Sequence, residues 1–358
     1  MVETIGSQAL ERIAARWQVD EDRIVWTDQG FDWWPGRYRV SVKALAGVPD
    51  ADGERWRLAV RTDVLKDVPL TDDTLRSVIA ELAALSPTYA WVFAPPDLDA
   101  VFVKNGQPVD PRIWFQSSVY VDESSLDWAP DFLARMALMQ PTDAERMGDY
   151  LAETLRGRPD SSAPNGQPVA DHLDEMLNVP QLIYTPAGQE PSRWCGSGEF
   201  EEFAERFAMQ DTCFGFGDPN GLTVETPIGS DSALVRLHTD LPHPALGHGL
   251  LATAQLPAVQ DRPSIVAQSQ FLNYLEAVSW TDVPQLGSWH PKERGEGCHI
   301  SAHGFFIPNA LFVRGMAANA AFWQLGRARF AKQLLWPDVE DLTMAKIITA
   351  RFAESDGS

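Results

Sequence analysis

The chain has 358 residues, about twice the length of a typical domain, so it can form two domains with ample cores. Its 29 Lys and Arg against 50 Asp and Glu give a formal net charge of −21, which argues against nucleic-acid binding and against attachment to anionic membrane surfaces. The first residues lack the basic charge of a signal peptide and no apolar run reaches membrane-spanning length, so we expect a cytoplasmic protein.

The first half of the chain is predicted to combine helices with antiparallel strands. Ser7 can cap a helix whose apolar residues share one face, and residues 38–45 and 55–61 alternate apolar and polar side chains as half-buried strands do. An amphipathic helix over 75–85, a strand over 113–121 and closing helices complete this half. The pattern predicts an α+β domain with a three-stranded meander, covered by helices.

A linker is expected after this first half. Residues 156–170 are rich in Pro, Gly, Ser and Asn and nearly lack apolar side chains. A short helical piece and a further Pro- and Gly-bearing segment follow. We therefore expect one domain over 1–156, a linker over 157–192 and a second domain over 193–358.

The second half repeats the order of the first, which predicts a tandem duplication. The apolar spacing of a helix, a Thr-Asp pair near a strand and a later strand recur in the same sequence. The matched segments are 10–17 with 200–207, 62–63 with 239–240, and 119–121 with 305–307.

The repeated order resembles a known family. The residues that carry the likeness are 222–236 (LTVETPIGSDSALVR), 239–251 (TDLPHPALGHGLL), 86–93 (SPTYAWVF) and 191–194 (PSRW). They resemble the YbjN and type III secretion chaperone-like domains of bacteria, and the whole chain resembles two-domain proteins of high-GC Gram-positive bacteria. The resemblance implies a small sheet-and-helix module that binds proteins or peptides and usually dimerises, and it supplies no active-site residues. Two tethered copies would form an intramolecular pseudo-dimer, monomeric in solution.

Histidines offer the main candidate for metal chemistry. His238, His243 and His248 lie five residues apart in a segment with two prolines, so only a loop could bring the three rings to one metal ion. The alternative is a strand connection with exposed histidines. The three cysteines are odd in number and lack CxxC spacing, which favours neither a disulfide framework nor a thiolate zinc site.

Adjacent tryptophans offer a candidate binding surface. Trp33 and Trp34 precede a Pro-Gly turn, and strand alternation would leave one of them outside the core. Exposed aromatic surface is typical of partner-binding sites. The alternative is burial of both rings between the two halves of the chain.

These patterns together predict a non-enzymatic, chaperone-like or regulatory protein that binds a protein or peptide partner, with Trp33 and Trp34 as the contact residues. No catalytic or cofactor-binding residue is predicted, because the chain lacks a phosphate-binding loop, a dinucleotide fingerprint and a nucleophile elbow. The competing hypothesis is a metal-assisted hydrolase that uses His238, His243 and His248.

Overall fold

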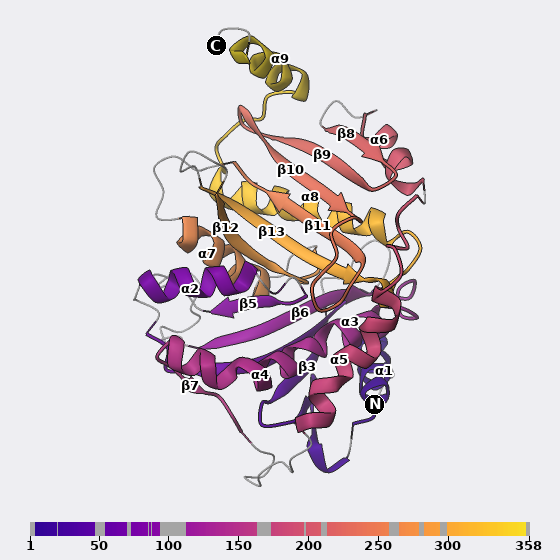
Figure 1. Cartoon of the computed structure of the whole chain (residues 1–358), viewed down its shortest axis with the longest axis vertical. Helices are drawn as coiled ribbons and strands as arrows, with labels where there is room; N and C mark the ends of the chain where they lie inside the picture. The colour runs from indigo at the N-terminus through magenta and orange to yellow at the C-terminus, as the bar shows by residue number, and fades with distance from the viewer. Residues whose placement is uncertain are drawn as a thin grey trace. The chain divides into compact units, whose positions relative to one another are not determined.

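The computed structural model describes most of the chain (Figure 1). The described residues are 4–19, 21–46, 54–69, 73–84, 86, 88–93, 112–162, 173–196, 198–208, 213–257, 265–278, 283–293 and 299–355. Within these residues no helix is long and apolar enough to cross a membrane.

The chain divides into two compact units that do not follow the expected boundaries. Unit 1 comprises Met1–Leu182 with Ser269–Trp289, and unit 2 comprises Ile183–Gln268 with His290–Ser358. A segment from the second half of the sequence therefore belongs to unit 1. The expected linker also contains regular structure, because a short strand and a helix lie between residues 157 and 192.

Unit 1 contains a sheet with the strand order β1-β2-β3-β4-β6-β5, and the short strand β7 pairs with β4. Every pairing given for these strands is antiparallel. Its elements are α1 (Ile5–Trp17), η1 (Glu21–Arg23), β1 (Ile24–Thr27), β2 (Gly30–Trp33), β3 (Val40–Ala46), β4 (Trp56–Lys66), α2 (Asp73–Ala84), β5 (Ala90–Phe93), β6 (Ile113–Val121), α3 (Ala129–Ala137), α4 (Met139–Thr154) and β7 (Arg158–Pro159).

The second sheet has the order β12-β13-β11-β10-β9-β8. Two helices, α5 and α7, and the strand β12 each cross the limits of a unit. The elements from here on are α5 (Leu173–Gly188), α6 (Glu199–Ala208), β8 (Phe214–Asp218), β9 (Gly221–Ile228), β10 (Asp231–His238), β11 (Gly249–Gln255), α7 (Ile265–Val278), β12 (Ser288–Glu293), β13 (His299–Pro308), η3 (Asn309–Leu311), α8 (Met316–Leu335) and α9 (Met344–Ser355).

Both sheets share one topology. In each of them, a helix comes first and four successive antiparallel strands follow it as a meander. A second helix and two more strands come next, and the last strand pairs with the fourth strand of the meander. Residues 119–121 lie in β6 and residues 305–307 in β13, and each of these strands pairs with the fourth strand of its meander, so the two segments lie in equivalent strands. The other strand match is wrong by one strand, because Thr62 and Asp63 lie in β4 whereas Thr239 and Asp240 follow β10, which is the equivalent of β3. The meander has four strands, not three.

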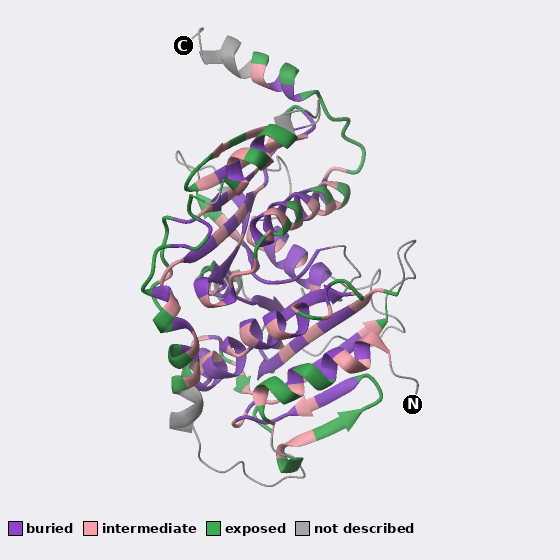
Figure 2. Ribbon diagram, turned by 90° about the vertical axis from the view of Figure 1, so that its right-hand side faces the viewer, coloured by how far each residue is buried: buried purple, intermediate pink, exposed green. Residues whose placement is uncertain are grey.

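Alternation of side chains determines which face of each sheet is covered. In β3, Val40 and Val42 are buried and Lys43 is exposed, and the helices α1, α3 and α4 pack on unit 1 strands. Figure 2 shows buried residues running through the strands. In unit 2, α8 contacts β10 and β11 and α6 contacts β8. Each sheet thus has one face that is covered by helices, which leaves the opposite face for other contacts.

The first helix begins differently from the prediction. Its N-cap is Thr4, whose Oγ1 accepts a hydrogen bond from the Ser7 backbone N–H at 3.1 Å, while Ser7 Oγ accepts from the Thr4 N–H at 2.9 Å. Ser7 is therefore the reciprocal partner in a capping box and not the cap itself.

Candidate functional site

The two predicted binding tryptophans are buried. Trp33 is 9% exposed and stacks on Trp17 of α1 with a ring-centroid distance of 4.7 Å. Trp34 is 7% exposed, and its Nε1 donates to Ser162 Oγ at 3.0 Å. All four residues belong to unit 1. The expectation of an exposed tryptophan surface is therefore wrong, because α1 covers the end of β2 and the chain after β7 returns beside Trp34.

The three candidate histidines do not form a metal site. His243 Nδ1 accepts hydrogen bonds from the backbone N–H groups of Ala245 and Leu246 at 3.1 and 3.2 Å, and the His243 ring packs against Phe306. Burial lowers the pKa of His243, and burial is also the largest cause that lowers the pKa of His238. No group of three His, Cys, Asp or Glu side chains in the described part of the chain could hold a metal ion. The alternative in which a loop brings His238, His243 and His248 to one metal ion is therefore wrong for these described residues.

An exposed apolar strand lies at one edge of the unit 2 sheet. Phe214 and Phe216 of β8 are 46% and 59% exposed, and they are two residues apart, so both side chains lie on one face. Within the described residues β8 pairs with β9 alone, so its other side presents backbone N–H and C=O groups without a neighbouring strand.

The opposite face of β8 is closed by a helix. An added Cβ at Gly217 would lie 2.3 Å from the Phe200 backbone oxygen, so α6 approaches the strand more closely than any side chain would allow. This contact fixes β8 on unit 2. The two phenylalanines are therefore presented on the face that α6 does not cover.

The surroundings of this strand are acidic. The helix α6 carries four glutamates and one arginine, and that arginine, Arg206, pairs with Glu202 in an exposed ion pair of 2.5 Å. Asp218 ends β8, and Glu225 lies opposite Phe214 in β9. The edge strand thus combines apolar side chains with an excess of negative charge.

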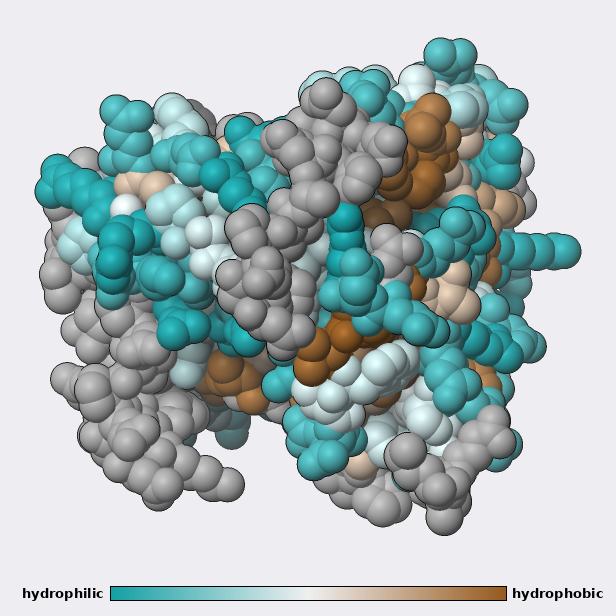
Figure 3. All heavy atoms as spheres, turned by 90° about the horizontal axis from the view of Figure 1, so that it is seen from below, coloured by the Kyte–Doolittle hydropathy of each residue, from teal (hydrophilic) through white to brown (hydrophobic). Residues whose placement is uncertain are grey.

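Figure 3 shows separate hydrophobic areas among hydrophilic side chains on the face of the molecule that is seen from below. Several large apolar side chains elsewhere in the described chain are also exposed. They include Val25, Trp26, Tyr150, Leu182, Leu241, Val278, Phe322, Val339 and Leu342. Single exposed apolar side chains are normal on protein surfaces, so a strand edge that presents two phenylalanines on one face is the more informative feature.

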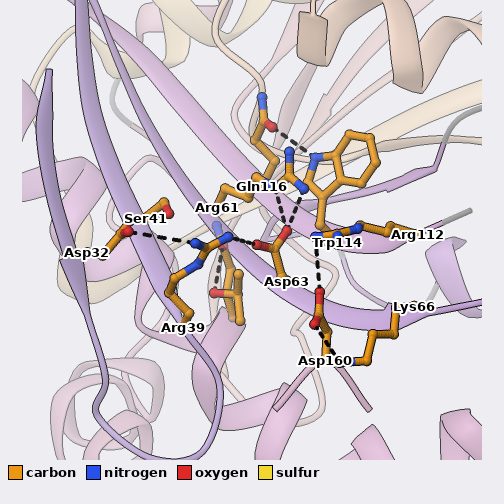
Figure 4. A network of polar contacts seen from close by, with 12 residues as sticks. Asp32, Arg39, Ser41, Arg61, Asp63, Lys66, Arg112, Trp114, Gln116 and Asp160 are labelled. Atoms are coloured by element: carbon orange, nitrogen blue, oxygen red, sulfur yellow. Dashed lines mark hydrogen bonds and ion pairs between the residues drawn. The ribbon is translucent and has the colours of Figure 1, made fainter. Parts of the chain in front are cut away.

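A second notable cluster lies on the face of the unit 1 sheet opposite α1, α3 and α4 (Figure 4). Arg39 and Arg61 converge on the buried carboxylate of Asp63, each at 2.5 Å. Burial opposes ionisation of Asp63, but attraction to Arg61 and the hydrogen bonds and charge of Arg39 outweigh it, so the pKa of Asp63 is lowered. Asp63 therefore stays charged and holds the two guanidinium groups in place.

The same cluster extends from β2 to β6. Arg39 also lies 3.7 Å from Asp32, and the guanidinium of Arg61 lies over the Trp114 ring, 4.2 Å from its centroid. Trp114 Nε1 donates to Gln116 Oε1 at 3.0 Å. Nearby, Asp160 pairs with Lys66 and Arg112 at 3.3 and 3.4 Å. These contacts give the face a fixed arrangement of charges.

The sequence contains a signal for this cluster. Basic residues stand at alternate positions of two adjacent predicted strands, which places their side chains on one face. Alternation alone is also typical of an ordinary solvated face. The edge position of β8 carried no sequence signal, because edge strands are defined by partners far away in the chain.

No protein-family model, curated protein or solved structure matches the chain.

Proposed function

We propose that this chain is a non-enzymatic cytoplasmic protein of chaperone-like or regulatory type, and that it binds an extended segment of a protein partner along the free edge of β8. The observation that carries the proposal is the exposure of Phe214 and Phe216 on an edge strand. A segment that pairs with β8 would satisfy the backbone groups of the edge and cover both rings.

The charge around β8 favours one kind of occupant. The glutamates of α6 together with Asp218 and Glu225 attract lysine and arginine side chains. A second copy of the chain would bring another net charge of −21 to the same place, which opposes self-association through this edge. The partner segment is therefore extended, carries alternating apolar residues and is basic.

The repeated α+β topology supports this proposal, since both sheets have one face covered by helices and a strand at each edge. The intramolecular pseudo-dimer stays part of this proposal. The histidines no longer support the hydrolase alternative. His243 accepts hydrogen bonds from its own loop, and the three histidines do not form a metal-binding group.

Binding of a synthetic peptide tests the proposal. The peptide alternates Val and Lys, carries a fluorophore and is titrated with the full chain. We expect saturable binding that weakens at least tenfold in the Phe214→Ser, Phe216→Ser double variant, because both apolar contacts are lost. A peptide methylated on alternate backbone nitrogens should bind as weakly, because strand addition uses main-chain hydrogen bonds.

The control is Leu182→Ser on α5, which removes a more exposed apolar side chain (75%) that is not part of β8 and should leave peptide affinity unchanged. Melting temperatures establish that all variants fold. Equal affinity of the wild type and the double variant, or tight binding of the methylated peptide, contradicts strand addition at β8.

A further inference from the structure

A cavity opens beside the cluster around Asp63, on the face of the unit 1 sheet opposite α1, α3 and α4. Its volume is about 260 Å³. The lining residues come from β3 and the residue before it, from β4, from β6 and from the end of α7: Arg39, Ser41, Lys43, Leu45, Arg57, Ala59, Arg61, Gln116 and Ala277. All of them belong to unit 1. Four of the lining side chains are cationic and none is anionic.

The strand register explains both the hollow and its charge. Ser41 lies opposite Arg61, Lys43 opposite Ala59, and Leu45 opposite Arg57. The small side chain of Ala59 therefore stands between two long arginines on its own strand, and a lysine lies across from it. Long side chains around a small one leave a concavity whose walls carry the positive groups.

The cations are held by different means. Asp63 holds Arg39 and Arg61 from one side of the cavity. Arg57 is buried and donates to Ser118 Oγ and to the Glu276 backbone oxygen at 3.3 and 2.7 Å. Burial lowers the pKa of Arg57, although Tyr120 and Glu276 partly offset this effect. Three guanidinium groups are thus fixed before any ligand arrives.

Lys43 is the exposed member of the set. Its side chain is exposed on β3, and it makes no ion pair with any described residue. An ammonium group on a flexible stem beside three fixed guanidinium groups can close over a bound anion. Arginine has five N–H donors, so Arg39 and Arg61 keep donors beyond those that Asp63 uses.

Unit 2 shows that the fold does not require this charge. On the corresponding face of β10 and β11 the side chains are Ser232, Leu234, Arg236, His238, Leu251, Thr253 and Gln255, which include one arginine. The same topology is therefore built there without a cluster of four permanent cations. A concentration of positive charge in a chain of net charge −21 calls for a local role.

We propose that this cavity binds a small anion with a carboxylate or phosphate group. Arg39, Arg57 and Arg61 bind the acid group, and the side chain of Lys43 covers it. The volume lies just below the range of roughly 300–1,000 Å³ that is usual for drug-sized ligands, so the ligand is of metabolite size. The net charge of the chain repels long polyanions but permits a compact one. The proposal is independent of the β8 edge.

Isothermal titration of the full chain with inorganic phosphate and, separately, with succinate tests the proposal and distinguishes the two acid groups. We expect saturable binding of at least one anion and a matching rise in melting temperature. Lys43→Met should weaken that binding roughly tenfold, because it removes a charge-assisted contact. Ala59→Leu should abolish binding, because it fills the hollow without changing the charge.

The matched control is Arg236→Met, which removes a cation from the corresponding face of unit 2 and should leave the affinity unchanged. Lys43 is exposed and makes no ion pair among the described residues, so its variant should keep the fold. The melting temperature of each variant without ligand verifies this. The proposal is overturned if neither anion binds saturably, or if the Lys43 and Ala59 variants bind as the wild type does.

Discussion

At the scale of single residues, a partly buried carboxyl links the stability of unit 1 to pH. Asp143 on α4 accepts a hydrogen bond from Tyr89 Oη at 2.8 Å, and Tyr89 Oη in turn accepts from Ser86 Oγ. Burial raises the pKa of Asp143 to about 6, against the opposing effects of the Tyr89 hydrogen bond and of Arg146. Burial likewise raises the pKa of Tyr89 well above its ordinary value.

Asp143→Asn should change the pH dependence of stability. The folded-state pKa exceeds the unfolded one, so protonated Asp143 favours the folded state at low pH and this contribution is lost as pH rises through about 6. From about pH 5 to about pH 7.5, the unfolding free energy of the wild type should therefore fall relative to the variant by roughly 1–3 kcal/mol. Urea unfolding at several pH values measures the difference. Parallel curves for the two proteins would show that Asp143 ionises in the fold as it does in water.

At the scale of elements, the close approach of α6 to β8 makes one glycine critical. Gly217→Ala would place a Cβ 2.3 Å from the Phe200 backbone oxygen, and backbone atoms cannot move aside as the end of a side chain can. The helix must shift, so we expect a loss of about 1–3 kcal/mol in unfolding free energy. Chemical denaturation of the variant measures this loss.

The control for this variant is Gly304→Ala in β13. An added Cβ there meets no atom closer than 3.9 Å, and the residue already has ordinary strand geometry. We expect this substitution to be neutral or slightly stabilising, because it reduces the freedom of the unfolded chain. Equal effects of both alanines would mean that the packing of α6 on β8 does not constrain Gly217.

At the scale of the whole molecule, unit 1 depends on a segment from the second half of the sequence. The Ser118 backbone N–H donates to the Gln285 oxygen at 2.8 Å, and the Gln285 N–H donates back at 3.0 Å. Gln116 Nε2 reaches Gln285 Oε1 at 2.9 Å. The segment 269–289 thus covers part of β6 and gives unit 1 contacts that its own half of the sequence does not supply.

Removal of this segment should expose β6. In a fragment of residues 1–182, we expect the Ser118 amide to exchange hydrogen at least about tenfold faster than in the full chain, because its acceptor is missing. Hydrogen exchange measured by mass spectrometry or NMR gives the comparison. Full-length Gln285→Pro, which lacks the returning donor, should show a smaller increase at the same site while the Val60 amide in β4 stays protected. Unchanged exchange at Ser118 in both proteins would contradict this role of the segment.

The sequence by itself determined the local features of this protein. Alternating residues such as Val40, Val42 and Lys43 specify half-buried strands, and the order of helices and strands recurs in both halves. These features depend on neighbours in the chain, so periodicity predicts them. The sequence predicted three strands in each meander and the structure has four. The first strand was missed because β1 has only four residues and β8 alternates phenylalanine with glycine, so both lack a clear apolar–polar alternation.

Tertiary structure alone decided which of these residues are accessible. Trp33 is covered by Trp17 and Trp34 meets Ser162, whereas the predicted solvated face of β4 contains a buried Arg57 beneath residues that lie more than two hundred positions later. The cation cavity and the free edge of β8 arise from strand register and strand order in the same way. Periodicity separates the two faces of a strand, but it does not reveal what covers each face, because that is settled by contacts between distant segments.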